Sequence, residues 1–258
     1  MGEKKVVSSK GKKWEALFVS DWHVPFQDDK AISLTLKILK EHTPDYVIFG
    51  GDLIDAYNVS SFRKRPDMYN LQEEFDRASV IVEKYMSASP KSKFVFLEGN
   101  HEDRITRSLM ENPQFWGLRN LELSSLWSES LGFGVDVYSE FLIDGYLFKH
   151  GTKANKYSAN SELDLEDVSG MSGHVHRIQR MTRSNRNRII TWDNVGHLAD
   201  IKKLEYVQRT FNGNPNWQQG YGYVTYKNGV YTVDNNPIFI KNGYYQTFFR
   251  GKLYKVKK

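Results

Sequence analysis

The sequence predicts an α/β fold, and three observations support this class. Short apolar runs alternate with segments at helical spacing through the N-terminal half of the chain. Each apolar run ends in a cluster of polar residues, as happens where the strands of an α/β sheet lead into ligand-binding loops. Beyond Gly220, aromatic and β-branched residues alternate around the pairs Asn228-Gly229 and Asn242-Gly243, a pattern typical of β-hairpins.

The N-terminal half supplies the strand and helix pattern. Residues 14–20 are an apolar run and are expected to form a buried strand. Residues 28–42 carry apolar side chains at helical spacing and stop before a proline, so we expect a helix there. The same pattern repeats in a strand at 46–49, a helix at 71–87 and a strand at 94–97.

The C-terminal half is expected to be richer in strands. Residues 104–131 have helical but less regular spacing, and residues 141–150 and 189–195 are each expected to form one strand. The lysine-rich ends, before Trp14 and after Leu253, are expected to be frayed.

Composition narrows the class of protein. With 258 residues, of which 40% are hydrophobic and 26% charged, the chain is expected to form a single domain over residues 1–258. The absence of cysteine excludes disulfides, thiolate metal sites and cysteine nucleophiles, so a metal must be held by nitrogen and oxygen ligands. No apolar stretch is long enough for a signal peptide or a bilayer span, which predicts a cytoplasmic protein without a membrane partner. The formal net charge of +5 weakly favours anionic partners.

Five polar clusters stand out, most of them at the ends of expected strands. They are Asp21-Trp22-His23, Gly51-Asp52-Leu53-Ile54-Asp55, Gly99-Asn100-His101-Glu102, His150-Gly151 and Gly173-His174-Val175-His176. Asp and His at alternate positions of an extended segment point to the same side, and the neighbouring glycines allow a close approach of the backbone. A pair of divalent ions needs a carboxylate that bridges them, with further neutral or anionic ligands for each.

The order of these clusters resembles the calcineurin-like metallophosphoesterases, whose signature is D-x-H, GDxxD, GNH followed by Asp or Glu, a lone His and GHxH. The resemblance extends from Asp21 to His176, about two-thirds of the chain. It implies a four-layer α/β/β/α sandwich in which two mixed sheets are flanked by helices. It also implies a hydrolase that binds two divalent ions.

The resemblance assigns a role to each residue of the signature. One ion would be held by Asp21, His23 and His176, the other by Asn100, His150 and His174, with Asp52 bridging both. His101 would face the substrate and act on the leaving oxygen, and Asp55 would orient His101, although an Asp after a turn can equally cap backbone N–H groups. A bridging hydroxide would be the nucleophile. Mn²⁺ is the expected metal, with Fe²⁺, Zn²⁺, Ni²⁺ and Co²⁺ as alternatives.

The substrate is expected to be a phosphate ester, with a diester preferred. The protein-phosphatase branch of the family has arginines directly after GDxxD and before GNHE, and this chain has Ala56 and Glu98 there. The leading prediction is a phosphodiesterase or nuclease acting on nucleic acid or nucleotides. The alternatives are a phosphomonoesterase on a nucleotide or phosphoprotein, and a catalytically dead scaffold that binds nucleic acid, which the complete ligand set disfavours.

Basic and aromatic residues near the clusters are candidates for substrate binding. Arg104 could contact phosphate, and two basic stretches could track a phosphate backbone, although solvated surface charge explains them equally well. These stretches are Arg63-Lys64-Arg65 and the series Arg177, Arg180, Arg183, Arg186 and Arg188. The aromatic residues that could stack on a base are Trp22, Tyr57 and Phe62.

Several points stay open at the level of sequence. His197 follows an expected strand and is ambiguous, because the signature is complete without it. The nuclease branch of the family usually adds a DNA-binding or dimerisation region, and no segment stands out as one. Residues 216–222 resemble a stretch of phage-borne and bacterial members, which suggests a phage origin. The oligomeric state is not predicted.

Overall fold

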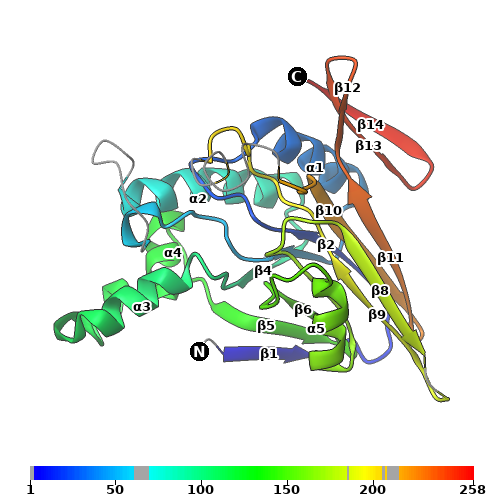
Figure 1. Ribbon diagram of the computed structural model, residues 1–258, viewed down its shortest axis with the longest axis horizontal. Coiled ribbons are helices and arrows are strands. Elements are labelled where there is room, and N and C mark those ends of the chain that lie inside the picture. The colour runs from blue at the N-terminus through cyan, green and yellow to red at the C-terminus, as the bar shows by residue number, and fades with distance from the viewer. Residues whose placement is uncertain (1–2, 61–69, 185, 205–206, 208–214) are drawn as a thin grey trace.

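The computed structural model describes residues 3–60, 70–184, 186–204, 207 and 215–258. Within these ranges the strands form one eleven-stranded mixed sheet and one three-stranded sheet, with helices packed against them (Figure 1). The basic stretch at 63–65 and Phe62 lie outside the described residues.

The first half of the large sheet has the expected strand and helix order. Three parallel strands alternate with two helices: β2 (Trp14–Val19), α1 (Asp29–His42), β3 (Tyr46–Phe49), α2 (Leu71–Ala88) and β4 (Lys93–Leu97). Both helices start at side-chain caps. The Asp28 carboxylate accepts hydrogen bonds from two backbone N–H groups of α1, and Asn70 forms a capping box with Glu73 at the start of α2. The predictions for these elements are confirmed.

The second half differs from the prediction at residues 141–150. Two antiparallel strands occupy this region, β5 (Val137–Ile143) and β6 (Tyr146–Lys149), joined by a tight turn at Asp144-Gly145. Both turn residues have positive φ, 46° and 81°, which is the backbone that an Asp-Gly hairpin turn requires. The prediction of a single strand was therefore wrong, because Asp144-Gly145 forms a turn inside the apolar run and divides it into two strands.

Five further strands complete the order of the large sheet, and one more helix, α5 (Ser158–Glu166), precedes them. The strands are β7 (Ser169–Ser172), β8 (Gln179–Ser184), β9 (Ile189–Asn194), β10 (Gly220–Lys227) and β11 (Val230–Pro237). The order along the sheet is β11-β10-β2-β3-β4-β5-β6-β7-β9-β8. Strands β4 and β5 are joined through only two residue pairs, so the sheet has two halves with a short seam between them.

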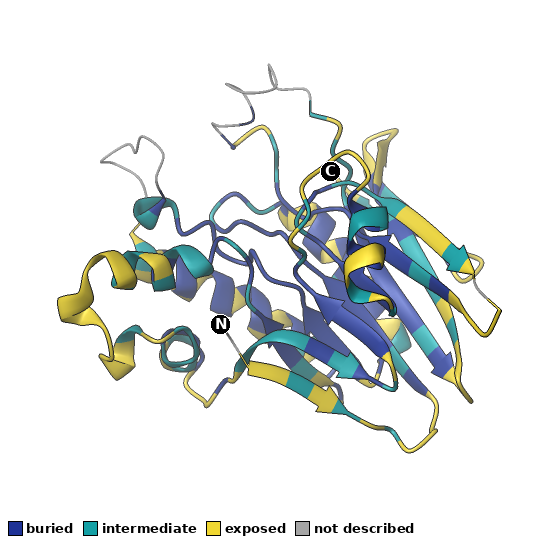
Figure 2. Cartoon of the chain, turned by 60° about the horizontal axis from the view of Figure 1, so that its bottom comes forward, coloured by how far each residue is buried: buried dark blue, intermediate teal, exposed yellow. Residues whose placement is uncertain are grey.

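The two halves pack face to face. The ring of Phe18 on β2 stacks on Phe148 of β6 at a centroid distance of 6.0 Å, inside a buried cluster that also contains Ile48 and Met171. A second cluster lies between the first half and α1, α2 and α4 (Leu123–Leu131), and a third lies between α5 and the second half. These are the four predicted layers, with the two sheets continuous at the seam, and Figure 2 shows the central strands as buried and strands at the edges as partly exposed. The α/β fold class is confirmed.

Residues 3–7 and 252–257, in the two lysine-rich ends, form strands, contrary to expectation. The N-terminal strand β1 (Glu3–Val7) pairs in parallel with β5. The C-terminal three-stranded sheet consists of β12 (Phe239–Lys241), β13 (Tyr244–Phe249) and β14 (Lys252–Lys257), and it packs on α1. The prediction rested on lysine-rich composition, but β1 pairs with a strand far along the chain, and Tyr254 of β14 is buried in the core that includes α1. Both expected hairpins are confirmed, β10-β11 and β12-β13.

The region after β4 is helical and irregular, as predicted. It contains α3 (Asp103–Glu111), α4 and the 3₁₀ turns at Pro113–Phe115 and Arg119–Leu121, and a further 3₁₀ turn lies at Tyr57–Val59. No helix in the described ranges is long and apolar enough to cross a membrane.

Candidate metal centre

Five loops carry the residues predicted to bind metal, and each loop follows a strand. The loops after β2, β3 and β4 come from the first half of the large sheet, and those after β6 and β7 come from the second. Strands β2, β3 and β4 are parallel, as are β6 and β7, so the carboxyl ends of each set meet at one edge. The predicted ligands on these loops are Asp21, His23, Asp52, Asn100, His150, His174 and His176.

One group of buried side chains contains Asp21, His23, Asp52 and His176. The His176 Nε2 atom lies 3.0 Å from Asp21 Oδ1 and 3.0 Å from His23 Nε2. The His23 Nε2 atom is also 3.9 Å from Asp52 Oδ2. Two ring nitrogens and two carboxylates therefore converge on one point.

A second group shares Asp52 with the first and adds His150 and His174. The His150 Nε2 atom is 3.3 Å from Asp52 Oδ2. The amide oxygen of Asn100 lies between the two rings, 3.0 Å from His150 Nε2 and 2.7 Å from His174 Nδ1. His150 donates its Nδ1–H to the Gly50 carbonyl at 2.8 Å, which leaves Nε2 for the interior of the group.

A third group consists of His23, Asp55 and His101. The Asp55 Oδ1 atom lies 3.3 Å from His23 Nδ1 and 3.2 Å from His101 Nδ1. The main-chain oxygen of Asp55 also accepts from His101 Nδ1 at 2.8 Å. The Nδ1 atoms of both rings thus face Asp55, and both Nε2 atoms face Asp52.

The backbone of these loops is strained where the side chains converge. Positive φ values occur at five of the seven predicted ligands: Asp21, His23, Asp52, His174 and His176. A left-handed conformation costs energy for residues with a Cβ atom, and such residues cluster at functional sites. The strain supports a functional role for these loops over a structural one.

Glycines allow the loops to approach one another. A Cβ atom on Gly99 would lie 2.2 Å from Asp52 Oδ1, and one on Gly51 would lie 2.6 Å from the Gly99 nitrogen. Neither contact is sterically tolerable, and Gly51 also has a φ of +86°. The sequence prediction that glycines permit close approach at these loops is confirmed at both positions.

The buried carboxylates and histidines of these groups shift one another's pKa values. Burial raises the pKa of Asp21, but His176 and His150 together outweigh this effect and lower that pKa well below its usual range. Burial lowers the pKa of His150, but the Asp52 and Asp21 carboxylates and the Gly50 carbonyl together outweigh it and raise that pKa to about 10. For His174, burial and the neighbouring His150 lower the pKa to about 4, in spite of the opposite effect of the Asp52 and Asp21 charges.

The donor set fits divalent cations. Buried lone pairs of nitrogen and oxygen point at one another across 3 to 4 Å, and the His23 and His176 Nε2 atoms face each other at 3.0 Å. A cation between such atoms removes their mutual repulsion, and mixed imidazole, carboxylate and amide ligands suit transition metals. Asp52 belongs to both groups and is placed to serve two ions.

Two buried glutamates support the loops, and the sequence did not single out either for this role. Glu102 is 1% exposed, and its carboxylate accepts hydrogen bonds from the backbone N–H groups of Asp52, Leu53, Ile54 and Gly99. Burial raises the pKa of Glu102 to about 7.

Glu74 on α2 has a comparable position at the other end of the Asp52 loop. It accepts hydrogen bonds from the N–H groups of Ala56 and Tyr57, at 2.6 and 3.1 Å. Burial, followed by the charge of Asp55, raises the pKa of Glu74 to about 8. Glu102 belongs to the cluster Gly99-Asn100-His101-Glu102, but its role as an acceptor for the Asp52 loop is not visible in the sequence, and no local signal marks Glu74, because these partners are distant in the chain.

The predicted substrate-binding arginines have different positions. Arg104 reaches the third group, where its guanidinium donates to the Asp55 carbonyl at 2.7 Å and to His101 Nε2 at 2.9 Å. Arg177 donates to the Asn155 carbonyl instead. Arg180 is held on β8 by Asp193 at 2.9 Å.

Most arginines of the series between Arg177 and Arg188 form ion pairs with acidic residues. Arg183 pairs with Asp164 and Asp167, and Arg188 pairs with Asp167. With Arg180 already paired, three members of the series have a structural partner, which favours the interpretation as paired surface charge over backbone tracking.

Trp22, a candidate for stacking on a base, and His197, whose role the sequence leaves open, are both buried. Trp22 is fully buried and stacks on Tyr85 at 5.5 Å, so it cannot stack on a base and that suggestion was wrong. His197 is also buried and lies beside a predicted ligand, with its ring 5.4 Å from that of His176. The Nδ1 atom of His197 accepts from the Ala199 N–H, and His197 belongs to none of the three groups.

Residues 16–223 match the family described as calcineurin-like phosphoesterase. The chain belongs to this family. It is therefore a metal-dependent phosphoesterase, a hydrolase that acts on phosphate ester bonds. This confirms the resemblance found from the five polar clusters.

The similar curated proteins come from bacteriophages. The Gene 54 protein of Mycobacterium phage L5 is 27% identical over 238 residues, which cover 80% of this chain and 87% of that protein. The Gene 54 protein of Mycobacterium phage D29 is 25% identical over 254 residues, 85% of this chain and 89% of that protein. Both relatives support the prediction of a phage-borne member.

Solved structures with a related arrangement include Vps29 of Chaetomium thermophilum and Yfce, a phosphoesterase from E. coli. Vps29 aligns with a TM-score of 0.48 and 12% identity over 94% of this chain and 95% of its own. Yfce aligns with a TM-score of 0.41 and 15% identity over 91% of this chain and 92% of its own. Similarity at this level says nothing about the activity of this chain.

Proposed function

We propose that the chain is a phosphodiesterase that uses two divalent ions and acts on nucleic acid or nucleotides. The observation that carries the two-ion part is the position of Asp52, whose carboxylate belongs to two groups of nitrogen and oxygen donors at once. Asp21, His23 and His176 would hold one ion, and Asn100, His150 and His174 would hold the other. Bound ions would lower the pKa of a water molecule and offset the negative charge of the phosphoryl group.

The preference for a diester is supported by the charge around the site. A phosphomonoester dianion carries one negative charge more than a diester and needs more cationic side chains. The two positions where the protein-phosphatase branch has arginine are Ala56, which is buried, and Glu98, which adds negative charge. Arg104 is the arginine with contacts at the third group, and it is engaged by His101 and Asp55.

His101 is proposed to assist the leaving oxygen. Its Nδ1–H is fixed by Asp55, so the proton that it delivers must come from Nε2. In this arrangement Nε2 accepts a hydrogen bond from Arg104 and carries no proton. Arg104 therefore has to release this atom when substrate binds, and Nε2 has to take up a proton from solvent before it can deliver one. The guanidinium is then free to contact a phosphate oxygen.

Mn²⁺ is the proposed metal, because the ligands combine imidazole, carboxylate and amide oxygen. The cytoplasmic location and the single domain over residues 1–258 stay predictions from the sequence.

The first experiment compares hydrolysis of bis-p-nitrophenyl phosphate with that of p-nitrophenyl phosphate. The protein is stripped of metal and reloaded with Mn²⁺, and kcat/KM is measured for both substrates. Faster turnover of the diester supports the proposal. Faster turnover of the monoester replaces it with a phosphomonoesterase, and hydrolysis of neither, with fewer than two ions bound per chain, indicates a dead scaffold.

A further inference from the structure

The C-terminal sheet β12-β13-β14 has one face against α1 and the other in solvent. Tyr245, Phe249 and Tyr254 on the inner face are buried in the core that includes α1. The opposite side chains form a second set, which we name the outer face and define by six residues. The outer face consists of Phe239, Lys241, Tyr244, Phe248, Lys255 and Lys257.

Aromatic and lysine side chains alternate on the outer face. Lys241 on β12 pairs with Tyr244 on β13, and Tyr244 pairs with Lys257 on β14. The Lys255 ammonium lies 5.9 Å from the centre of the Tyr244 ring. Phe239 is 59% exposed and Phe248 is 64% exposed, although full burial is the usual state of phenylalanine.

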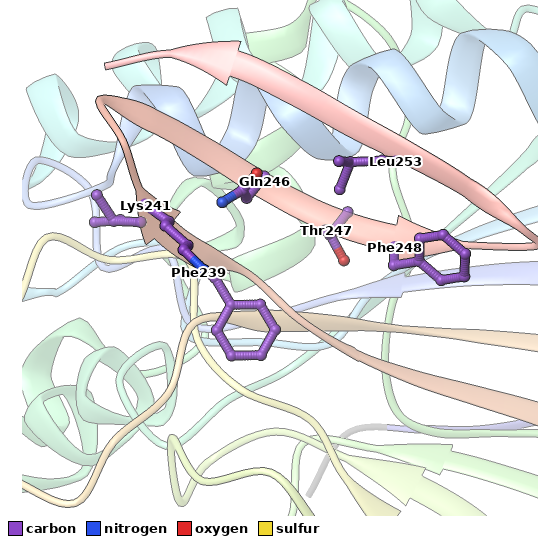
Figure 3. A pocket seen from close by; sticks show the side chains of 7 residues that line it. Phe239, Lys241, Gln246, Thr247, Phe248 and Leu253 are labelled. Carbon is purple, nitrogen blue, oxygen red and sulfur yellow. The ribbon is translucent and has the colours of Figure 1, made fainter.

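A shallow hollow of about 500 Å³ lies on this face, lined by Phe239, Gln246, Phe248 and Leu253 among others. Figure 3 shows the Phe239 ring below the Gln246 and Thr247 side chains and the Phe248 ring to the right of Thr247, with Lys241 at the left. The two exposed rings beside the hollow are flat apolar surfaces, and within the described residues no other part of the chain covers them.

The charge of this segment is unlike that of the rest of the molecule. Residues 238–258 contain six Lys and Arg residues and no Asp or Glu, so residues 1–237 have a formal net charge of −1, against +5 for the whole chain. Arg250 and Lys252 are paired with Glu15 and Glu41. Within the described ranges, the three lysines of the outer face form no ion pair, in contrast to the arginines of β8.

We propose that the outer face binds single-stranded nucleic acid, with bases stacked on the aromatic rings and phosphates contacted by the three lysines. A sheet that presents exposed rings between cationic side chains has the two features that single strands require. A symmetric dimer through the same face would bring its lysines against their own copies, which disfavours self-association. The site is separate from the metal centre and does not depend on the diester preference.

Binding is tested by fluorescence anisotropy with labelled DNA and RNA single strands of about 20 nucleotides. The full chain is used with EDTA present, so that no hydrolysis occurs. Replacing Phe239 and Phe248 by Ala together is expected to weaken binding at least about tenfold, since each lost stack removes affinity. Replacing Lys241, Lys255 and Lys257 by Ala is expected to reduce the slope of log Kd against log salt by about two, at roughly 0.7 for each phosphate contact.

Matched variants separate this face from general surface effects. Phe115→Ala with Trp116→Ala removes two exposed aromatics elsewhere, and Lys30→Ala with Lys84→Ala and Lys91→Ala removes three exposed lysines. Both control variants should bind as the unmodified chain does. Equal losses in test and control variants, or no binding by the unmodified chain, overturn the proposal.

Sedimentation analysis of the same variants tests whether a second copy of the chain, rather than nucleic acid, covers the outer face. If the unmodified chain is a dimer that the Phe239 and Phe248 changes dissociate, and it binds no single strand, the outer face is a self-association surface and the proposal fails. Hydrolysis of bis-p-nitrophenyl phosphate by the outer-face variants should be unchanged. Failure of the binding site is thereby distinguished from failure of the phosphodiesterase proposal.

Discussion

At the residue scale, the Asp52 carboxylate contacts the backbone or the ring of three histidines. One carboxylate oxygen of Asp52 accepts the N–H of His101 at 2.8 Å, while the other faces the rings of His23 and His150. The histidines are in turn oriented by carbonyl and carboxylate groups behind them. A substitution in this network changes either the ligand itself or the direction in which a ring points.

The His101 ring is expected to act in catalysis without binding metal. His101→Ala should keep both ions but slow kcat by about 10²-fold, since proton transfer to the leaving oxygen is lost. Metal content by atomic absorption and kcat on bis-p-nitrophenyl phosphate measure the two effects. His42→Ala is the control, because it changes a histidine at the end of α1 that belongs to none of the three groups. Near-normal turnover in His101→Ala would remove its catalytic role.

Glu74 makes stability depend on pH. Its pKa is raised to about 8 in the folded chain, against 4.5 for the ordinary group. Its contribution to stability is therefore fully present below about pH 4.5 and is lost as the pH rises through 8, because the folded state holds the proton more tightly.

Urea unfolding of the metal-stripped protein at about pH 5.5 and pH 8 measures this dependence. Glu74→Gln should flatten the fall in unfolding free energy between these two conditions, whereas Glu83→Gln, an exposed position on the same helix, should leave it unchanged. The same slope in Glu74→Gln and the unmodified chain would show that Glu74 is ionised when folded.

At the element scale, the loops are fixed by contacts between elements that are distant in sequence. The loop after β3 is held on one side by Glu102, at the start of α3, and on the other by Glu74, on α2. Each helix thus contributes both apolar packing and one buried acceptor. The left-handed backbone at Asp52 persists because these acceptors satisfy the N–H groups that follow it.

Loss of the Glu102 acceptor should release the loop. Glu102→Ala leaves the N–H groups of Asp52, Leu53 and Gly99 buried without their acceptor, so we expect the unfolding free energy to fall by about 3 kcal/mol. Mn²⁺ affinity should fall as well. Glu102→Gln keeps one acceptor oxygen and should give an intermediate loss. Urea unfolding and metal titration test this, and an unchanged metal affinity in Glu102→Ala would mean that the loop is held by other contacts.

At the scale of the whole molecule, the two halves of the sheet meet at the proposed metal centre. Asp21, Asp52 and Asn100 come from the first half, whereas His150 and His174 come from the second. The backbone seam between the halves is only two residue pairs of β4 and β5. Ions held by ligands of both halves would add a second connection between them.

Metal removal should therefore destabilise the whole fold. A ligand that binds only the folded state adds about 2.7 kcal/mol at a hundred times its Kd, so Mn²⁺ should raise the Tm and a chelator should lower it. Calorimetry with and without EDTA measures this shift. Asp52→Asn, which weakens the shared ligand, should show a smaller shift and little activity. Equal Tm values with and without metal in the unmodified chain would contradict the bridging role.

The sequence by itself determined the strand and helix order of the first half, the chemistry of the ligands and the family. These features are local, since helical spacing, apolar runs and short motifs are carried by neighbouring residues. Tertiary structure alone decided the roles of Glu102 and Glu74, the pairing of Arg180 with Asp193 and the order at the lysine-rich ends. In each case the deciding partner lies on another element, and no local pattern specifies which distant group will satisfy a buried charge or a strand edge.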